Sequence, residues 1–193
     1  MILLAGPSGS GKSRVARLAS CPALALDDFY RDHDHPGLPR AHGIVDWDDL
    51  ASWDPDGAMA ALARLCTEGE AEVPTYDIAL SRRTGTRVLR LGSSGCVVAE
   101  GLFAADLVTA CRRAGLLADA LYLHRPRAVT LAMRLVRDVR EQRKPIGLLI
   151  RRGLALCAAE PAVRATALAR GCRPVSLREA LEVVEARMQT KTP

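Results

Sequence analysis

The stretch GPSGSGKS, residues 6–13, follows the apolar run Met1–Ala5 and precedes a segment with helical spacing. It fits the pattern G-x-x-x-x-G-K-[ST] at every fixed position. Glycines let such a backbone fold around phosphate oxygens, so that successive N–H groups point inward. A helix that follows presents its positive N-terminal end to the same place. The stretch therefore predicts a phosphate-binding loop between a strand and a helix.

The residues of this loop have separate expected tasks. We expect Lys12 to reach the β- and γ-phosphates of ATP, and the Ser13 hydroxyl to bind Mg²⁺. An accidental match in a Gly/Ser-rich turn is the alternative, but the position between a strand and a helix is the one that the mechanism needs. The residues of the loop that we expect to bind ATP are Gly6, Ser8, Gly9, Ser10, Gly11, Lys12, Ser13 and Arg14.

Outside the loop, short apolar runs alternate with helical patterns, which is typical of a mostly parallel sheet with helices on its faces. A chain of 193 residues suits a single domain, 1–193. We expect an α/β fold of the P-loop NTPase type, with about five strands in its mostly parallel sheet. Strands are predicted at 1–5, 23–26, 96–101 and 119–124, and helices at 12–19, 55–66, 105–114, from 127, at 148–159, at 161–170 and from 176.

Two segments are predicted to stand apart from this sheet. Residues 73–91 suggest an extended hairpin with its turn at 82–86, inside a substrate-side insertion at about 28–91. A helical lid is predicted at about 134–147. The chain is expected to be helical throughout after residue 127, and Ser176 and Glu179 have the capping-box spacing at the start of the last helix.

Composition narrows the classes of function. The formal net charge is +5, but no basic block is interleaved with aromatic residues, so we do not expect nucleic-acid binding. No apolar run approaches the roughly 20 residues of a membrane span. The apolar opening is too short for a signal peptide, so we expect a cytoplasmic protein. The 6 cysteines include no C-x-x-C pair and the 4 histidines lack ligand spacing, so we do not expect a zinc site.

The rest of the chain separates the classes of P-loop protein. Regulatory GTPases read their base with N-K-x-D, and this chain contains no asparagine. Transport ATPases carry an L-S-G-G-Q signature, which is also absent from the sequence. These two absences leave small-molecule kinases as the leading class.

Carboxylates are predicted at the ends of two strands. Asp27 and Asp28 directly follow the second predicted strand, in the segment LDDFYRD. Open α/β sheets bind ligands at the carboxyl ends of their strands, where such a group can accept a hydroxyl proton or hold a Mg²⁺-bound water. A helix cap within a solvated acidic turn is the alternative. Glu100 closes the third predicted strand, where P-loop enzymes often keep a second carboxylate near magnesium.

Five further segments match known patterns in register. D-S-F-Y is matched by Asp27–Tyr30, F-D-H-P-D-A-F-D by Trp47–Asp54, and Y-D-F-x-x-H-S-R by Tyr76–Arg83. E-G falls on Glu100–Gly101, and R-x-x-R-D-x-x-E-R-G falls on Arg134–Arg143. Together with the loop, these segments resemble the uridine–cytidine kinase branch of the P-loop kinases, which is related to phosphoribulokinase and bacterial pantothenate kinase. The resemblance extends over nearly three-quarters of the chain.

The resemblance implies roles for the matching residues. Asp27 would be the general base for a sugar 5′-hydroxyl and, with Ser13 and Glu100, a ligand of Mg²⁺. Asp48 would accept hydrogen bonds from the ribose 2′- and 3′-hydroxyls, assisted by Arg134. Trp47 and Tyr76 would lie beside the nucleobase, and Tyr30 near the acceptor. The implied substrate-binding residues are Tyr30, Trp47, Asp48, Tyr76, Arg83 and Arg134.

The lid and the base-reading position differ from the family pattern. Arg137 is implied to act in catalysis over the transferring phosphoryl group, and Arg140 to bind ATP. The arginine and glycine that follow the lid glutamate in the family are Gln142 and Arg143 here. The base-reading histidine of the family aligns with Ser81. The alternative for the lid helix is a solvated face with i,i+4 ion pairs.

The sequence thus predicts an enzyme that uses ATP and Mg²⁺ to phosphorylate the 5′-hydroxyl of a pyrimidine ribonucleoside, uridine first and cytidine second. A P-loop kinase of another hydroxylated metabolite, such as pantothenate or a sugar, is the second hypothesis. A nucleotide-binding regulator that has lost turnover is the third. A pure binder needs no general base, so the joint presence of Asp27, Lys12, Ser13 and Glu100 favours the enzymes.

Overall fold

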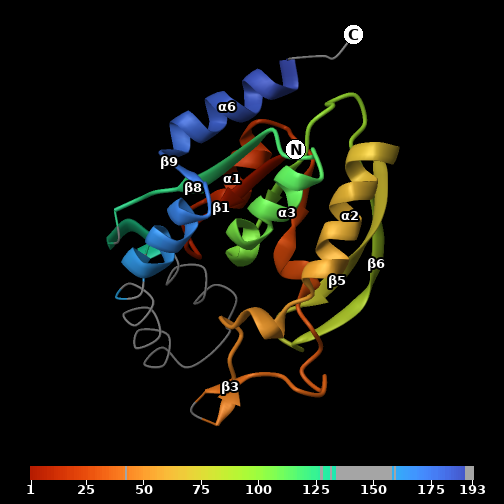
Figure 1. Ribbon diagram of the computed structural model, residues 1–193, viewed down its shortest axis with the longest axis vertical. Helices are drawn as coiled ribbons and strands as arrows, with labels where there is room; N and C mark the ends of the chain where they lie inside the picture. The colour runs from red at the N-terminus through yellow and green to blue at the C-terminus, as the bar shows by residue number, and fades with distance from the viewer. Residues whose placement is uncertain (42, 127, 131, 134–157, 159, 190–193) are drawn as a thin grey trace.

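A five-stranded parallel sheet forms the centre of the protein (Figure 1). The computed structural model describes residues 1–41, 43–126, 128–130, 132–133, 158 and 160–189. In spatial order the strands are β2 (Ala23–Ala25), β7 (Val98–Glu100), β1 (Ile2–Ala5), β8 (Asp119–Leu123) and β9 (Arg173–Val175). Every neighbouring pair is parallel. The predicted fold class, a P-loop NTPase-type sheet flanked by helices, is confirmed.

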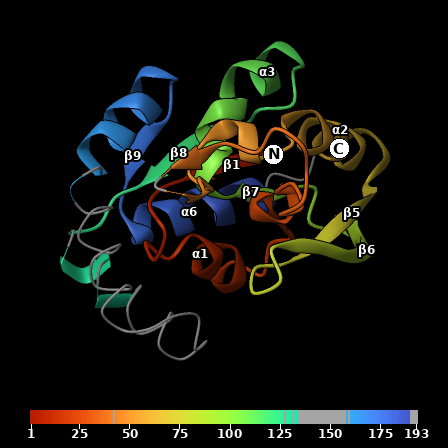
Figure 2. The same cartoon turned by 90° about the horizontal axis from the view of Figure 1, so that it is seen from below.

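Helices cover both faces of this sheet. They are α1 (Lys12–Leu18), α2 (Pro55–Glu68), α3 (Val108–Arg113), α6 (Leu177–Gln189) and a helix at 160–169. Successive side chains of a strand point to opposite faces. Ile2 and Leu4 therefore share a core with α1 and α6, whereas Leu3 and Ala5 share one with α2 and α3. Figure 2 shows the two pairs of helices on opposite sides of the sheet.

The segment between β2 and β7 holds the smaller elements. They are the 3₁₀ turns η1 (Leu26–Phe29) and η2 (Leu50–Ser52), the short strands β3 (Arg40–Ala41) and β4 (Ile44–Val45), and the antiparallel pair β5 (Glu70–Asp77) and β6 (Arg82–Arg90). The predicted hairpin is thus present, and it lies beside α2 (Figure 1). Helix α2 begins at Pro55, a residue that fits the first position of a helix. The carboxylate of Asp54 before it caps the helix by accepting the Gly57 N–H at 3.0 Å.

The hairpin turn lies at residues 78–81, so its predicted position at 82–86 is wrong. Asp77 Oδ1 accepts the N–H groups of Ala79 and Leu80 at 2.8 and 3.0 Å. An aspartate that bonds the backbone just ahead of it stabilises a turn. Gly85, which suggested the later turn, is paired with Thr75 inside the hairpin.

Strand β9 was not expected, because the sequence beyond residue 127 suggested helices alone. Gly171 ends the helix at 160–169 with a φ of 96°, and the chain then pairs with β8, with Val175 opposite Leu123. Pro174 is tolerated within the strand because β9 lies at the edge of the sheet.

The helix predicted at 105–114 is divided into the 3₁₀ helix η3 (Leu102–Leu107) and α3. The predicted lid at 134–147 and most of the helix predicted at 148–159 lie outside the described residues. In the described part of the chain, no helix is both long and apolar enough to cross a bilayer.

Candidate active site

The glycine-rich loop leaves β1 at the centre of the sheet and leads directly into α1, as the motif predicted. Gly6 has a φ of 148° and passes close to the end of β8. A Cβ at this position would lie 3.0 Å from the Leu123 carbonyl oxygen and 3.1 Å from Ser10 Oγ. Only glycine fits both the backbone angle and this close contact. The close approach of Gly6 to the end of β8 therefore fixes the path of the loop relative to the sheet.

Lys12 lies within the loop and is only 8% exposed. Its Nζ donates to the carbonyl oxygens of Gly6 and Pro7 at 2.9 and 3.2 Å. Among the residues that the structure describes, no carboxylate lies within ion-pair distance of Lys12. Ser10 Oγ is also buried and has no hydrogen-bond partner in the described part. Burying a charge without an ion-pair partner, or a hydroxyl without a hydrogen bond, is unfavourable. An anionic ligand in the loop would supply both partners.

Three oxygen-bearing side chains come together beside the loop. Ser13 Oγ donates to Glu100 Oε1 at 2.6 Å, and Glu100 lies in register between Leu4 and Ala25. Asp27 lies in the first turn of η1, just after β2, and its Oδ1 accepts the Leu102 N–H at 3.2 Å. Two carboxylates and a hydroxyl are hard oxygen donors, the type that Mg²⁺ prefers when it also binds substrate phosphates. The donor set therefore fits the predicted metal.

Gly101 allows Asp27 to lie this close to the end of β7. A Cβ at Gly101 would lie 2.9 Å from Asp27 Oδ1 and 2.8 Å from the Leu26 Cβ. Both distances are shorter than ordinary contacts, so any side chain here would displace η1. Glu100 is thus a candidate metal ligand, and Gly101 leaves the space that the Asp27 carboxylate occupies.

Asp28 points to a different environment from Asp27. Its carboxylate lies 3.6 Å from Arg87 Nη2 on β6. Burial raises the pKa of Asp28, and the charge of Arg87 opposes that effect. The two adjacent aspartates therefore point in different directions, Asp27 toward the chain that follows β7 and Asp28 toward the hairpin.

Tyr30 is the centre of an aromatic group that joins three parts of the chain. Its ring centroid lies 5.7 Å from that of Trp47, 5.9 Å from that of Tyr76 and 6.0 Å from that of Phe103. The Tyr76 hydroxyl donates to the Arg31 carbonyl oxygen at 3.2 Å, and burial raises the pKa of Tyr76 to about 12. The structure thus brings Tyr30, expected near the acceptor, together with Trp47 and Tyr76, expected beside the nucleobase.

Asp48 and Ser81 lie near this aromatic group in different settings. Asp48 is exposed, directly after Trp47, and its N–H donates to Asp46 Oδ1 at 3.1 Å. Ser81 adopts a left-handed backbone with a φ of 49°, and its hydroxyl donates to the Ile78 carbonyl oxygen at 3.3 Å. Ser81 therefore closes the hairpin turn.

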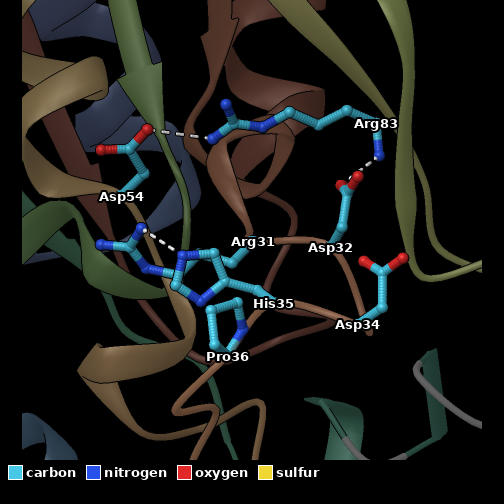
Figure 3. Close-up of a pocket in the computed structure, with 7 residues that line it drawn as sticks. All are labelled: Arg31, Asp32, Asp34, His35, Pro36, Asp54 and Arg83. Atoms are coloured by element: carbon cyan, nitrogen blue, oxygen red, sulfur yellow. Dashed lines mark hydrogen bonds and ion pairs between the residues drawn. The ribbon is translucent and has the colours of Figure 1, made fainter.

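Arg83, expected to bind substrate, makes several contacts within the protein (Figure 3). Its guanidinium donates to Asp54 Oδ2 at 3.0 Å and to the carbonyl oxygens of Phe29 and Tyr30 at 3.3 Å. Its N–H donates to Asp32 Oδ1 at 2.7 Å. Burial opposes ionisation of Asp54, but the bonds from Gly57 and Arg83 outweigh it and lower its pKa. Arg83 thus ties β6 to η1 and to the start of α2.

A pocket of about 380 Å³ lies against Arg83. Its lining consists of Arg31, Asp32, Asp34, His35, Pro36, Asp54 and Arg83 (Figure 3). The sequence prediction included only Arg83 from this set. The run RDHDHP at 31–36, rich in charge and ended by a proline, was the available signal for the others.

We expect Arg83→Gln to lower the free energy of unfolding by about 1 kcal/mol, because Asp54 and two carbonyl groups lose their shared hydrogen-bond donor. The effect is no larger because the ion pair with Asp54 is partly exposed to water, which weakens it. The change is measured by urea denaturation. Arg90→Gln is the matched control, since Arg90 lies on the same strand in an exposed pair with Glu70. Equal effects for the two variants would contradict the role of Arg83 in joining β6 to η1.

The lid arginines Arg134, Arg137 and Arg140 lie outside the described residues. Their implied roles stay predictions, as do the ligand contacts of the residues above. The structure does place Lys12, Ser13, Asp27 and Glu100 at the same end of the sheet, where its parallel strands have their carboxyl ends.

Comparison with solved structures supports the fold. A protein assigned as a fructose transport system kinase from Silicibacter sp. TM1040 superposes with a TM-score of 0.60 and 18% identity, over 85% of this chain and 84% of that one. A protein named a possible uridine kinase from Bacillus stearothermophilus has 19% identity over 76% of this chain and 83% of its own. Its TM-score of 0.45 is too low to support a conclusion.

Comparison with curated proteins gave shorter matches, and no known family profile matches the chain. The inorganic pyrophosphatases TTM2 and TTM1 of Arabidopsis thaliana are each 32% identical over 110 and 106 residues. Each match covers 54% of this chain, but only 15% and 16% of the plant proteins. The chain thus spans a small part of the curated relatives, whereas the first structural match spans nearly all of both chains. The chain has the fold of a P-loop kinase.

Proposed function

We propose that this chain is a kinase that transfers the γ-phosphoryl group of ATP to a hydroxyl of a small metabolite, with Mg²⁺ as cofactor. The position of Asp27 carries this proposal. Its carboxylate is fixed by the Leu102 N–H beside the hydrogen-bonded pair of Ser13 and Glu100. A nucleotide-binding regulator needs no proton acceptor there, whereas a kinase does.

The proposed roles of the residues follow from their positions. Lys12 holds the β- and γ-phosphates, and the loop backbone orients them. Ser13, Asp27 and Glu100 would hold Mg²⁺, which would supply positive charge against the phosphate groups when bound. Asp27 accepts the proton of the attacking hydroxyl. The protein therefore contributes mainly positioning and charge.

A pyrimidine ribonucleoside is our leading acceptor, phosphorylated at its 5′-hydroxyl. The aromatic group of Tyr30, Trp47 and Tyr76 supports this choice, since planar rings favour packing against a planar base. Asp48 lies next to Trp47 and is exposed, as a ligand of the ribose diol requires. Because Ser81 is short and is used in the turn, we expect weak discrimination between uracil and cytosine.

A sugar or a related polyol is the second candidate acceptor. The pocket beside Arg83 favours it, because all but one of its lining side chains are charged or carry an imidazole and can form hydrogen bonds with hydroxyl groups. The assignment of the Silicibacter protein as a fructose transport system kinase points the same way.

The test is ATP consumption with a panel of acceptors: uridine, cytidine, fructose, gluconate and pantothenate. We expect turnover with uridine and cytidine and none without an acceptor. Inorganic pyrophosphate, included because of the plant relatives, should not be hydrolysed. Turnover with a sugar alone would replace the leading acceptor by the second. Pyrophosphate hydrolysis without kinase activity would overturn the proposed reaction.

Deoxyuridine is expected to be a poorer acceptor than uridine by roughly tenfold to a hundredfold in kcat/KM, because a carboxylate that pairs with the ribose diol would lose one partner. Asp48→Ala should reduce this preference strongly. Asp49→Ala is the control, since Asp49 instead accepts the Ala51 N–H at 2.8 Å within η2. If wild-type rates with the two nucleosides are equal, Asp48 has no role in binding ribose.

A further inference from the structure

Arg125 lies at the glycine-rich loop although it comes from a distant part of the chain. It follows β8 by two residues, and the neighbouring His124 N–H donates to the Val175 carbonyl oxygen at 2.8 Å. This bond fixes the segment to β9. The Leu123 carbonyl oxygen just before it is in close contact with Gly6. The chain after β8 is therefore held against the loop from the side opposite β7.

The Arg125 guanidinium is placed at Gly11, the residue before Lys12. A Cβ at Gly11 would lie 3.9 Å from both Cζ and Nη2 of Arg125, and 3.3 Å from Leu177 Cδ1. Gly11 has no side chain, so the guanidinium lies directly beside the backbone of the loop. An anion bound by the N–H groups near Gly11 would be within reach of this second cation.

The hydrogen-bonding capacity of Arg125 is largely unused in the described part of the chain. A guanidinium has five N–H donors. The described residues give Arg125 one hydrogen bond, from Nη1 to Met133 Sδ at 2.8 Å, and a thioether is a weak acceptor. By contrast, Arg170 and Arg173 pair with carboxylates at 2.7 and 2.8 Å. A half-buried guanidinium whose described partner is sulfur is suited to an anionic ligand.

We propose that Arg125 is a further ligand of the nucleotide polyphosphate, on the α- or β-phosphate side of the loop. This inference rests on the proposed function. Lys12 and Arg125 then lie on either side of the bound polyphosphate, one from within the loop and one from the end of β8. Because the segment of Arg125 is fixed by β8 and β9 beside the loop, we expect Arg125 to bind phosphates that are present in both ATP and ADP.

The test is equilibrium binding to the purified full chain, measured with ATP, ADP, inorganic tripolyphosphate and adenosine. Arg125→Gln is expected to weaken ATP, ADP and tripolyphosphate by roughly tenfold to a hundredfold each, as for loss of a charged hydrogen bond. Adenosine binding should be unchanged. Arg125→Lys should restore part of the affinity, since lysine keeps the charge but not the fork of donors.

Arg17→Gln is the matched control, because Arg17 is exposed near the end of α1 and its loss changes the net charge equally. Unaltered ATP and ADP affinity in Arg125→Gln would overturn the inference. Loss of adenosine binding to the same degree would also overturn it, because Arg125 would then contact the base. Failure of the wild-type chain to bind ATP would instead contradict the proposed function itself.

Discussion

Lys12→Ala is expected to reduce phosphoryl transfer to the rate measured without protein. Lys12 is the residue of the loop that we expect to reach the β- and γ-phosphates with a full positive charge, and alanine supplies neither charge nor donor. ATP consumption with the best acceptor of the panel measures the effect. Near-wild-type turnover in this variant would exclude the kinase mechanism.

The burial of Lys12 affects how this experiment is controlled. Lys12 is 8% exposed, and its ammonium is bonded to two carbonyl groups of its own loop. Alanine therefore also removes two hydrogen bonds from the native loop. Urea denaturation of the variant separates loss of chemistry from loss of folding, and Arg17→Ala, on the exposed side of α1, serves as the surface control.

Asp27→Asn is expected to lower kcat by at least roughly a hundredfold, as is typical for loss of a general base. Asparagine keeps an oxygen that can accept the Leu102 N–H, so the geometry of η1 is preserved while the basic group is lost. The measurement is kcat at saturating substrate, with ATP affinity determined in parallel. We expect that ATP still binds.

Asp28→Asn is the matched control for this variant. The carboxylate of Asp28 lies toward Arg87 on the hairpin, at 3.6 Å, in a partly exposed pair that contributes little to stability. We therefore expect kcat to stay within a few-fold of the wild-type value. The reverse ranking of the two variants would show that Asp28, not Asp27, accepts the proton.

Much of the sheet and the core of the site could be predicted because their signals are local. The loop needs a buried strand before it and a helix after it, and both have clear patterns around residues 6–13. The carboxyl ends of parallel strands lie at the same end of a sheet. Asp27, which follows β2, and Glu100, which ends β7, were therefore expected near the loop that follows β1. The bond between Ser13 and Glu100, 87 positions apart, is a direct consequence of that topology.

The features that were missed depend on contacts between distant segments. Strand β9 has three residues, one of them proline, and becomes a strand through its pairing with β8. Arg83 was assigned to the substrate from its motif, but its partners on η1 and α2 are visible only in three dimensions. Arg125 has no motif, and its place at Gly11 follows from the packing of β8 against the loop.

The bonds from Lys12 to Gly6 and Pro7 make nucleotide binding an exchange of partners. The ammonium already donates two of its three N–H groups to neutral oxygens of its own loop, so an incoming anion competes with these oxygens for the positive charge. A singly charged anion gains little from this competition, because the ammonium already makes charge-assisted hydrogen bonds to the two carbonyl oxygens. An anion with several negative charges gains more. The loop is thus expected to bind tripolyphosphate much more tightly than chloride or nitrate, and to lose this preference as ionic strength rises.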